Sequence, residues 1–390
     1  MSSATIIMHF PDFDAQEFLR EYWQKKPLLI RNPWAEWRNP AEPDELAGLA
    51  CEEGVESRLV TGGETLTLEH GPLEDDRFGA LGTAPWTLLV QAVDHHIPAV
   101  ADLIEPFRFI PNWRIDDVMV SYATDNGGVG AHFDQYDVFL IQGLGRRRWE
   151  LGDPCNEQTA LLPHEDLRLL AEFEPREEWV LEPGDILYVP PGIAHRGTAI
   201  GDDCMTYSVG FRAPSRRELI EEWTEDLLGE MSEDDRFGDP DLEMQPNPGE
   251  ISAQTLSRLH QMVAEKLNDQ DRFARWFGKY ATTPKPSALD WRPEHAITPE
   301  EVSIALQSGT TLVRNPASRF AFVRQETESL LLYVDGEAIE CSGEAAVFAR
   351  TLCASPLVET TLSSATTQPA RDLILSLVNR GCIAFEEPEN

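Results

Sequence analysis

The stretch from residue 115 to residue 212 constrains the fold of this 390-residue chain more than any other part of it. Short apolar runs alternate there with turns rich in Gly and Pro, which is typical of an antiparallel β-barrel or sandwich. We therefore expect strands at Val118–Tyr122, Val138–Gln142, Arg147–Leu151, Ile186–Val189 and Met205–Phe211.

Helix signals lie on both sides of this β-rich stretch. Asp14-Ala-Gln-Glu17 predicts a helix N-terminus, and the apolar spacing of residues 86–93 predicts another helix before the barrel. Ser215-Arg-Arg-Glu218 is a capping box, and a second amphipathic helix is expected around 256–267, beyond a polar loop at 232–250. Because their apolar stripes must be buried on the barrel or on another subunit, we expect a dimer.

A third unit is expected to begin near Leu289, because residues 282–287 have the Pro- and Thr-rich composition of a linker. A helix start at Thr298-Pro-Glu-Glu301 and strand-like runs at 320–323 and 330–334 favour a small helix-plus-wing module. Such modules commonly contact DNA, but this one is rich in Glu, so we interpret it as a protein-interaction or packing module. The chain is thus predicted to be α+β, with domains at 1–212, 213–283 and 289–390.

The net charge of −36 repels phosphates, so neither direct nucleic-acid binding nor attachment to an anionic membrane is expected. This acidity either maintains solubility or recruits a basic partner, and both explanations stay open. Six cysteines without a C-x-x-C pair indicate reduced thiols. The chain also lacks a basic, apolar leader and a run long enough to span a membrane, so we expect a cytoplasmic protein.

The most specific constellation is Gly130-Ala-His132-Phe-Asp134, followed about sixty residues later by Pro190-Pro-Gly-Ile-Ala-His195. His132 and Asp134 are two positions apart, so on a strand their side chains would share one face, as a chelating pair requires. Pro-Gly turns on each side of an apolar strand would return His195 beside them. Two histidines and a carboxylate form the facial triad of non-haem iron(II) oxygenases, which leaves coordination positions open for a co-substrate and oxygen.

Zinc also accepts two histidines and a carboxylate, so the pattern predicts the position of a metal while leaving iron and zinc as candidates. A histidine that stood alone would be interpreted as packed or hydrogen-bonded. That interpretation applies to the other histidines of the chain, which are His9, His70, His95, His96, His164, His260 and His295.

A second feature indicates a dicarboxylate co-substrate. Gly143-Leu-Gly145 is expected to turn the chain into a strand on which Arg147 shares the inward, apolar face with Trp149 and Leu151. An arginine inside a barrel needs an anionic partner, and the far carboxylate of 2-oxoglutarate would be a bidentate one. A core Asp or Glu is the alternative partner.

The same alternation puts Asp117, Met119 and Ser121 on one face of a strand, and Tyr136 beside the predicted metal ligands. Ser121 could donate a hydrogen bond to the co-substrate carboxylate. Asp117 and Tyr136 could receive a cationic side chain of a protein substrate, the first by charge and the second by stacking. For each of these residues an ordinary barrel-lining role is the alternative.

Three segments of the chain resemble the bacterial JmjC-type ribosomal oxygenases. They are Gly128-Val-Gly-Ala-His-Phe-Asp-Gln-Tyr-Asp-Val-Phe-Leu-Ile-Gln-Gly-Leu-Gly-Arg-Arg-Arg-Trp149, Pro183-Gly-Asp-Ile-Leu-Tyr-Val-Pro-Pro-Gly192 and Tyr207-Ser-Val-Gly-Phe-Arg-Ala-Pro214. Trp23-Gln-Lys-Lys-Pro-Leu-Leu-Ile30 and the order of barrel, helical pair and winged helix are also similar, so the resemblance covers the whole chain. It implies a double-stranded β-helix (cupin/JmjC) core, a helical dimerisation domain that makes a homodimer, and a C-terminal winged helix.

The resemblance also implies an enzyme that uses Fe(II), 2-oxoglutarate and O2 to hydroxylate the β-carbon of an arginine in a basic ribosomal protein, the one numbered sixteen in the large subunit. By position, His132, Asp134 and His195 match the iron ligands, whereas Arg147 and Ser121 match residues expected to hold 2-oxoglutarate. The residues that match the substrate pocket are Asp117, Met119, Tyr136 and Ser208.

Two other functions are compatible with the same residues. An N-methyl demethylase of the same oxygenase class would differ only in which carbon faces the iron. A metal-binding cupin without catalysis would act as a binding module, although Arg147 argues against it because a pure binder needs no inward anchor for 2-oxoglutarate.

Overall fold

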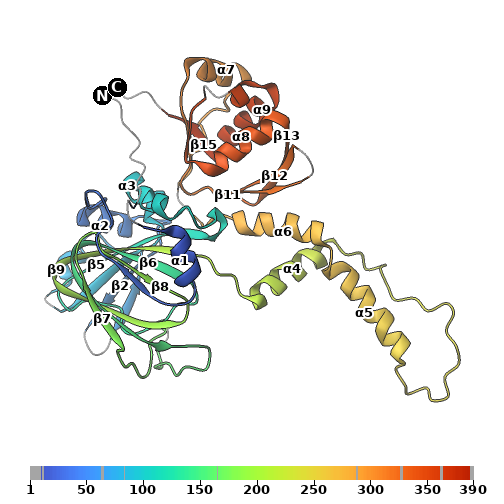
Figure 1. Cartoon of the computed structure of the whole chain (residues 1–390), viewed down its shortest axis with the longest axis horizontal. Helices are drawn as coiled ribbons and strands as arrows, with labels where there is room; N and C mark the ends of the chain where they lie inside the picture. Colours follow the sequence, from blue (N-terminus) through green and yellow to red (C-terminus); the bar gives the residue numbers. More distant parts are fainter. Residues whose placement is uncertain are drawn as a thin grey trace.

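Three units follow one another along the chain in the computed structural model: a β-barrel, a helical arm and a compact unit of helices and short strands (Figure 1). The N-terminal nine residues and Ser287 of the predicted linker lie outside the part of the chain that the structure describes. The described residues are 10, 13–62, 66–82, 84–164, 166–286, 289–325, 328–360 and 363–386.

The barrel is an antiparallel sheet with the strand order β1-β8-β6-β9-β5-β4-β2-β3, and β7 pairs with β6. Two long strands form its spine, because β6 and β9 pair along almost their whole length. The bounds of the strands are Leu28–Ile30 (β1), Ser57–Thr61 (β2), Thr67–His70 (β3), Trp86–Val90 (β4), Ile115–Ala123 (β5), Asp137–Pro154 (β6), Glu177–Leu181 (β7), Ile186–Val189 (β8) and Ile193–Phe211 (β9).

Short helices cover one side of this sheet and bury its aromatic side chains (Figure 1). Helix α1 begins at the predicted cap, where the Asp14 carboxylate accepts hydrogen bonds from two backbone N–H groups. Phe18 of α1 packs on Phe139 and Tyr188 of the sheet. The helices on this side are Ala15–Glu21 (α1), Pro43–Cys51 (α2) and Pro98–Ala101 (α3), with 3-10 turns at Phe78–Ala80, Val93–His95, Asp102–Phe107 and Asn112–Arg114.

Two predictions for the barrel are wrong. The expected helix at 86–93 is largely strand β4, which lies between β2 and β5 and is buried on both faces. An apolar run buried on both faces loses the alternation that marks a strand, so its spacing imitates a helix. The expected turn at Gly143-Leu-Gly145 is a pair of register shifts inside β6, so two predicted strands form one continuous strand.

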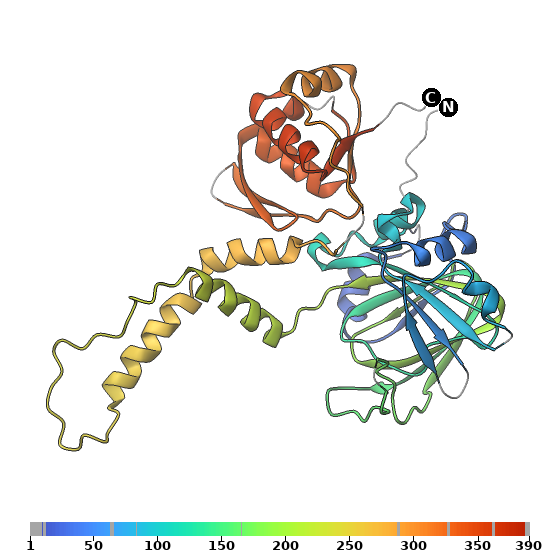
Figure 2. The same cartoon turned by 180° about the vertical axis from the view of Figure 1, so that it is seen from behind.

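The arm consists of α4 (Arg216–Glu230), α5 (Ala253–Leu267) and α6 (Gln270–Thr282). The predicted capping box at Ser215 is confirmed, while the second predicted helix ends near Asn268 and a new one starts at the Asp269 cap. Helices α4 and α6 pack through aromatic residues, whereas α5 buries none of its side chains and projects away from the other units (Figure 2). Among the described residues, no helix has the length and apolar character needed to cross a membrane.

The third unit contains the expected helices and wing. Its first helix starts at the predicted capping box of Thr298, and a three-stranded hairpin sheet packs against two later helices over an apolar core. The elements are Pro299–Ser308 (α7), Leu312–Arg314 (β10), Phe320–Arg324 (β11), Ser329–Val334 (β12), Glu337–Ser342 (β13), Gly343–Ala354 (α8), Leu357–Val358 (β14), Ser363–Thr366 (a 3-10 turn), Gln368–Asn379 (α9) and Ile383–Phe385 (β15).

The contact between α6 and β12 leads to a first prediction. A Cβ atom added at Gly278 would lie 2.3 to 2.4 Å from ring atoms of Tyr333, whose hydroxyl donates to the Ala274 carbonyl. We expect Gly278→Ala to destabilise the packing of the arm on the third unit by about 1–3 kcal/mol, measured as a lower Tm. Gly229→Ala in α4 is the matched control, because nothing lies within 4 Å of its added Cβ. Equal melting of both variants would show that Tyr333 does not pack closely on α6.

Candidate active site

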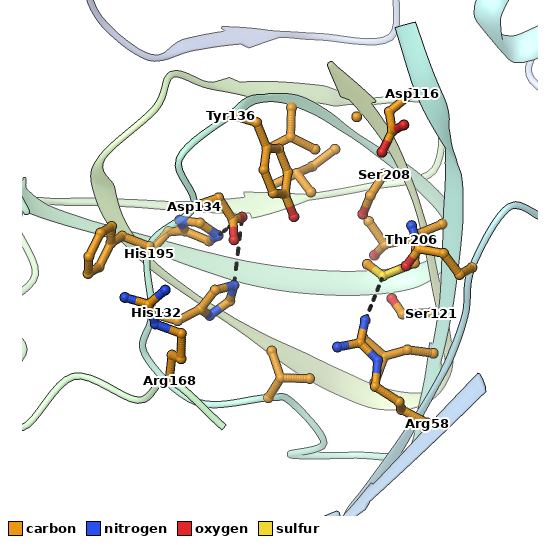
Figure 3. A pocket seen from close by; sticks show the side chains of 18 of the residues that line it. Arg58, Asp116, Ser121, His132, Asp134, Tyr136, Arg168, His195, Thr206 and Ser208 are labelled. Atoms are coloured by element: carbon orange, nitrogen blue, oxygen red, sulfur yellow. Dashed lines mark hydrogen bonds and ion pairs between the residues drawn. The ribbon is translucent and has the colours of Figure 1, made fainter. Parts of the chain in front are cut away.

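A cavity of about 730 Å³ lies inside the barrel, lined by side chains of β2, β4, β5, β6 and β9, the segment 166–169 and Lys285. Figure 3 shows part of this lining, including Arg58, Ser121 and His195. The structure brings every residue predicted for the site to this one cavity. They are His132, Asp134, His195, Arg147, Ser121, Asp117, Met119, Tyr136 and Ser208.

The two histidines and the carboxylate converge. Ligand atoms of His132, Asp134 and His195 all lie within 4.8 Å of one another, and no other group of this kind occurs in the described residues. The Nε2 atoms of His132 and His195 lie 4.0 and 3.6 Å from Asp134 Oδ2. Two metal–ligand bonds of about 2.1 Å each can span such a gap, so the three side chains fit one transition-metal ion.

Backbone hydrogen bonds hold the triad in place. The N–H of His132 donates to the carbonyl of His195 at 3.0 Å, and the N–H of His195 donates back at 2.8 Å. Gly192 N–H donates to the Asp134 carbonyl at 2.7 Å. Apart from this hydrogen bond, residues 133–136 form no strand. The prediction that Asp134 and Tyr136 share a strand face with His132 is therefore wrong. The loop nevertheless carries both residues to the cavity, where Tyr136 stays 43% exposed.

Both imidazole rings are set up to present Nε2 to a metal. Nδ1 of His132 lies 3.1 Å from the Gly130 carbonyl, and Nδ1 of His195 lies 2.9 Å from the Ile193 carbonyl. A carbonyl only accepts, so each Nδ1 carries a proton, and Nε2 is the nitrogen that remains available to a metal in the neutral ring. Burial, together with the neighbouring His132, lowers the pKa of His195 to about 4, which keeps this ring neutral at physiological pH.

Arg147 has the incomplete hydrogen bonding expected of a residue that binds an anion. Its side chain is 4% exposed, its Nε contacts Cys204 Sγ at 3.4 Å, and one of its terminal nitrogens has no partner. This unsatisfied terminal nitrogen, with no ion pair to a described carboxylate, favours an anion from outside the chain over a core Asp or Glu partner. Buried polar atoms are nearly always satisfied, and a bound carboxylate would satisfy this one.

Asp117 is buried and already has partners. Gln91 Nε2 donates to both of its oxygens, at 3.0 and 2.8 Å, and Lys285 Nζ donates to Oδ2 at 2.7 Å. Burial raises the pKa of Asp117, against the opposing charge of Lys285. Met119 and Ser208 are cross-strand neighbours on β5 and β9 that line the same part of the cavity.

Known proteins are similar to this chain in sequence and in fold. The JmjC domain family matches residues 102–219, an AraC-like ligand binding domain family matches residues 174–275, and a ROXA-like winged helix family matches residues 265–384. The chain is 39% identical to the ribosomal protein uL16 3-hydroxylase of Escherichia coli (strain K12), over 86% of each protein. It is 33% identical to a probable ribosomal oxygenase of Haemophilus influenzae, over 83% of this chain and 81% of that protein.

The chain belongs to the JmjC-type ribosomal oxygenases. A structure of the E. coli ribosomal oxygenase YcfD in complex with cobalt and 2-oxoglutarate matches it with a TM-score of 0.84 and 36% identity, over 96% of this chain and 99% of that one. The resemblance and the fold class predicted from the sequence are confirmed. So is the enzyme class, because JmjC-type ribosomal oxygenases depend on iron(II), 2-oxoglutarate and oxygen.

The sequence reasoning missed several residues of this ribosomal oxygenase's cavity. The Thr87 hydroxyl and the Trp149 ring nitrogen are buried there without a hydrogen-bond partner, as is the Arg147 nitrogen. Thr87 was missed because its strand was predicted as a helix. Trp149 could have been found, because it is two positions from Arg147 and so shares the inward face of the same strand. Arg168 also lines the cavity, from the loop between β6 and β7 (Figure 3).

The geometry of the triad leads to a second prediction. His132→Ala removes one of three ligands, so we expect the affinity for Co(II) to fall by more than about 100-fold, beyond the usual effect of changing a ligand's supporting partner. Calorimetric titration of the metal-free ribosomal oxygenase measures it. His70→Ala, an exposed histidine at the end of β3, is the control. Unchanged Co(II) binding by His132→Ala would mean that the metal site lies elsewhere.

Proposed function

We propose that this ribosomal oxygenase hydroxylates the β-carbon of an arginine in the ribosomal protein uL16. One observation carries the proposal: a three-ligand metal site and a buried arginine with no anionic partner among the described residues face the same cavity. The named activity of the E. coli relative supplies the substrate.

In this proposal His132, Asp134 and His195 hold iron(II). Bound iron would supply the oxidation chemistry, by activating oxygen at the expense of 2-oxoglutarate. The protein's own contribution is positional. Two imidazoles and one carboxylate would hold the ion, and a set of three protein ligands would leave coordination positions open for 2-oxoglutarate and oxygen.

Arg147 and Ser121 are proposed to hold 2-oxoglutarate. Arg147 would form a two-pronged ion pair with the 2-oxoglutarate carboxylate that lies far from the metal. The buried Ser121 hydroxyl, which lines the cavity, would donate a hydrogen bond to the same carboxylate. Thr87 and Trp149 contribute further buried donors without partners to the same cavity. An anion would satisfy several donors at once here, which a purely structural cavity would not require.

Asp117, Met119, Tyr136 and Ser208 are proposed to form the substrate pocket. Asp117 offers a buried carboxylate to a guanidinium, and the Tyr136 ring at the rim offers a face for stacking. The net charge of −36 would favour the approach of a basic ribosomal protein over that of free nucleic acid or an anionic membrane.

We also propose that the chain is a cytoplasmic homodimer, divided into an oxygenase domain (1–212), a helical dimerisation domain (213–283) and a winged-helix domain (289–390). The support lies in the arm, where seven apolar side chains are exposed in the single chain although the contact between α4 and α6 buries others. Exposed stripes of this size are typical of surfaces that a second copy buries. The exposed side chains are Ile220, Leu228, Leu256, Leu259, Val263, Leu267 and Phe273.

The two alternatives considered from the sequence predict different products. A demethylase would release formaldehyde from an N-methyl group, whereas a hydroxylase leaves the added oxygen on the substrate. A non-catalytic binding module would bind metal without consuming 2-oxoglutarate. The buried Arg147, with its unsatisfied nitrogen, favours an enzyme over the binding module.

The decisive test is mass spectrometry of uL16 after incubation with enzyme, iron(II), 2-oxoglutarate and oxygen. We expect a gain of about 16 Da, one oxygen from an iron oxygenase, on a single arginine. Asp134→Ala should abolish it. Consumption of 2-oxoglutarate without a mass gain on uL16 would reject the substrate and keep the oxygenase, whereas no consumption would favour the binding module.

Arg147 is tested by Arg147→Lys, which keeps the charge but loses the two-pronged contact. We expect the KM for 2-oxoglutarate to rise about 10- to 100-fold, as loss of a charge-assisted hydrogen bond predicts, with Co(II) affinity unchanged. Arg146→Lys, whose side chain is exposed on the other face of β6, is the matched control. If both variants keep the wild-type KM, Arg147 does not bind the co-substrate.

A further inference from the structure

Lys285 reaches into the cavity from the linker that follows α6. Its Nζ lies 2.7 Å from Asp117 Oδ2 and 2.7 Å from Asp116 Oδ2, and its side chain lines the cavity. The lysine side chain is 30% exposed, whereas that of Asp117 is 3% exposed. Lys285 therefore lies between the buried carboxylate of Asp117 and the solvent.

The contacts of the two carboxylates are distributed unequally. Asp116 Oδ1 accepts a hydrogen bond from Arg319 of the third unit at 2.9 Å, so Asp116 keeps a cationic partner without Lys285. Asp117 has Lys285 as its cation and is otherwise held by the neutral amide of Gln91. A guanidinium that binds two-pronged needs both oxygens of one carboxylate. An arginine arriving at Asp117 therefore competes for Oδ2, to which both Lys285 and Gln91 donate, and Lys285 is the competitor that carries a charge.

We propose that Lys285 occupies the cation subsite, which we define as the Asp117 carboxylate, until the arginine of the substrate displaces it. Lys285 thereby sets both the affinity of the enzyme for the substrate and its selectivity for a cationic side chain. This inference rests on the proposed function, because it assumes that Asp117 receives the substrate's cationic side chain.

The exchange conserves charge. Asp116 and Asp117 face the two cations Lys285 and Arg319 before the exchange, and they face Arg319 and the substrate's guanidinium afterwards. A neutral side chain could not replace Lys285 without leaving Asp117 buried beside no cation, which is costly. Lys285 therefore selects against neutral residues as well as competing with cationic ones.

Displacement of the Lys285 ammonium requires movement of its side chain alone, while the backbone of the linker stays in place. Prolines on both sides of Lys285, at 284 and 286, restrict the backbone of the linker, so the ammonium would leave by rotation of its flexible side chain. Burial acts to lower the pKa of Lys285, but the charges of Asp117 and Asp116 outweigh it and raise that pKa, so the lysine is a cation when it competes.

Lys285→Gln removes the competitor while keeping a polar side chain. We expect it to tighten the binding of acetyl-arginine amide to the Co(II)- and 2-oxoglutarate-loaded protein by about tenfold, if Lys285 occupies the subsite about nine-tenths of the time. The KM for a uL16 peptide should fall in parallel, with kcat retained. Lys279→Gln, an exposed lysine on α6 with the same change of charge, should alter neither value. Calorimetry and steady-state kinetics provide the two readouts.

Lys285→Arg provides a test in the opposite direction, because a guanidinium should hold Asp117 more firmly and weaken the binding of acetyl-arginine amide. Weaker or unchanged binding by Lys285→Gln, with wild-type Tm, would overturn the proposal and make Lys285 a positioning residue for Asp117. If Lys285→Gln does not fold, tighter or unchanged binding by Lys285→Arg overturns it. The calorimetric shifts without hydroxylation of uL16 would instead retain the subsite and reject the proposed function.

Discussion

The two backbone hydrogen bonds between His132 and His195 are the constraint on which the rest of the site depends. They belong to a longer contact in which residues 126–134 run beside 192–199, through hydrogen bonds that join Gly127 to Ala199 and Asp134 to Gly192. His195 is also held by β6, opposite Leu151. The irregular segment before β6 is thus fastened to a long strand, and these backbone hydrogen bonds bring the three side chains together.

Two buried charged residues of the cavity, Asp117 and Arg147, differ in whether a described residue of opposite charge lies beside them. Asp117 and Arg147 are 2% and 4% exposed, and burying an ion without a partner costs several kcal/mol. Lys285 supplies a cation for Asp117, whereas among the described residues the Arg147 side chain donates to the weak acceptor Cys204. The proposed binding of an anion from outside the chain would complete Arg147. Burial and the charge of Asp117 raise the pKa of Asp94 to about 8, so Asp94 stays protonated near neutral pH and adds no further negative charge.

The sequence predicted those features that depend on short spacings. The capping boxes at Ser215 and Thr298 mark helix starts because the cap is local, and alternation along one strand placed Arg147 inward. The strand β4 was misread because burial on both faces removes alternation. Lys285 could not be found at all, since it is 168 residues from Asp117 in sequence and no local pattern specifies which carboxylate a linker lysine meets.

A bulge in β5 connects the third unit to the pocket. Neighbouring residues of a regular strand point to opposite faces, yet Asp116 and Asp117 both contact Lys285. The register of β5 against β9 shifts between Ile115 and Val118, and an extra residue in a strand re-aims the side chains around it. Because Arg319 donates to the Asp116 carboxylate and to the backbone carbonyl of Asp116, the same bulge positions both the contact with the winged helix and the charged groups around Lys285.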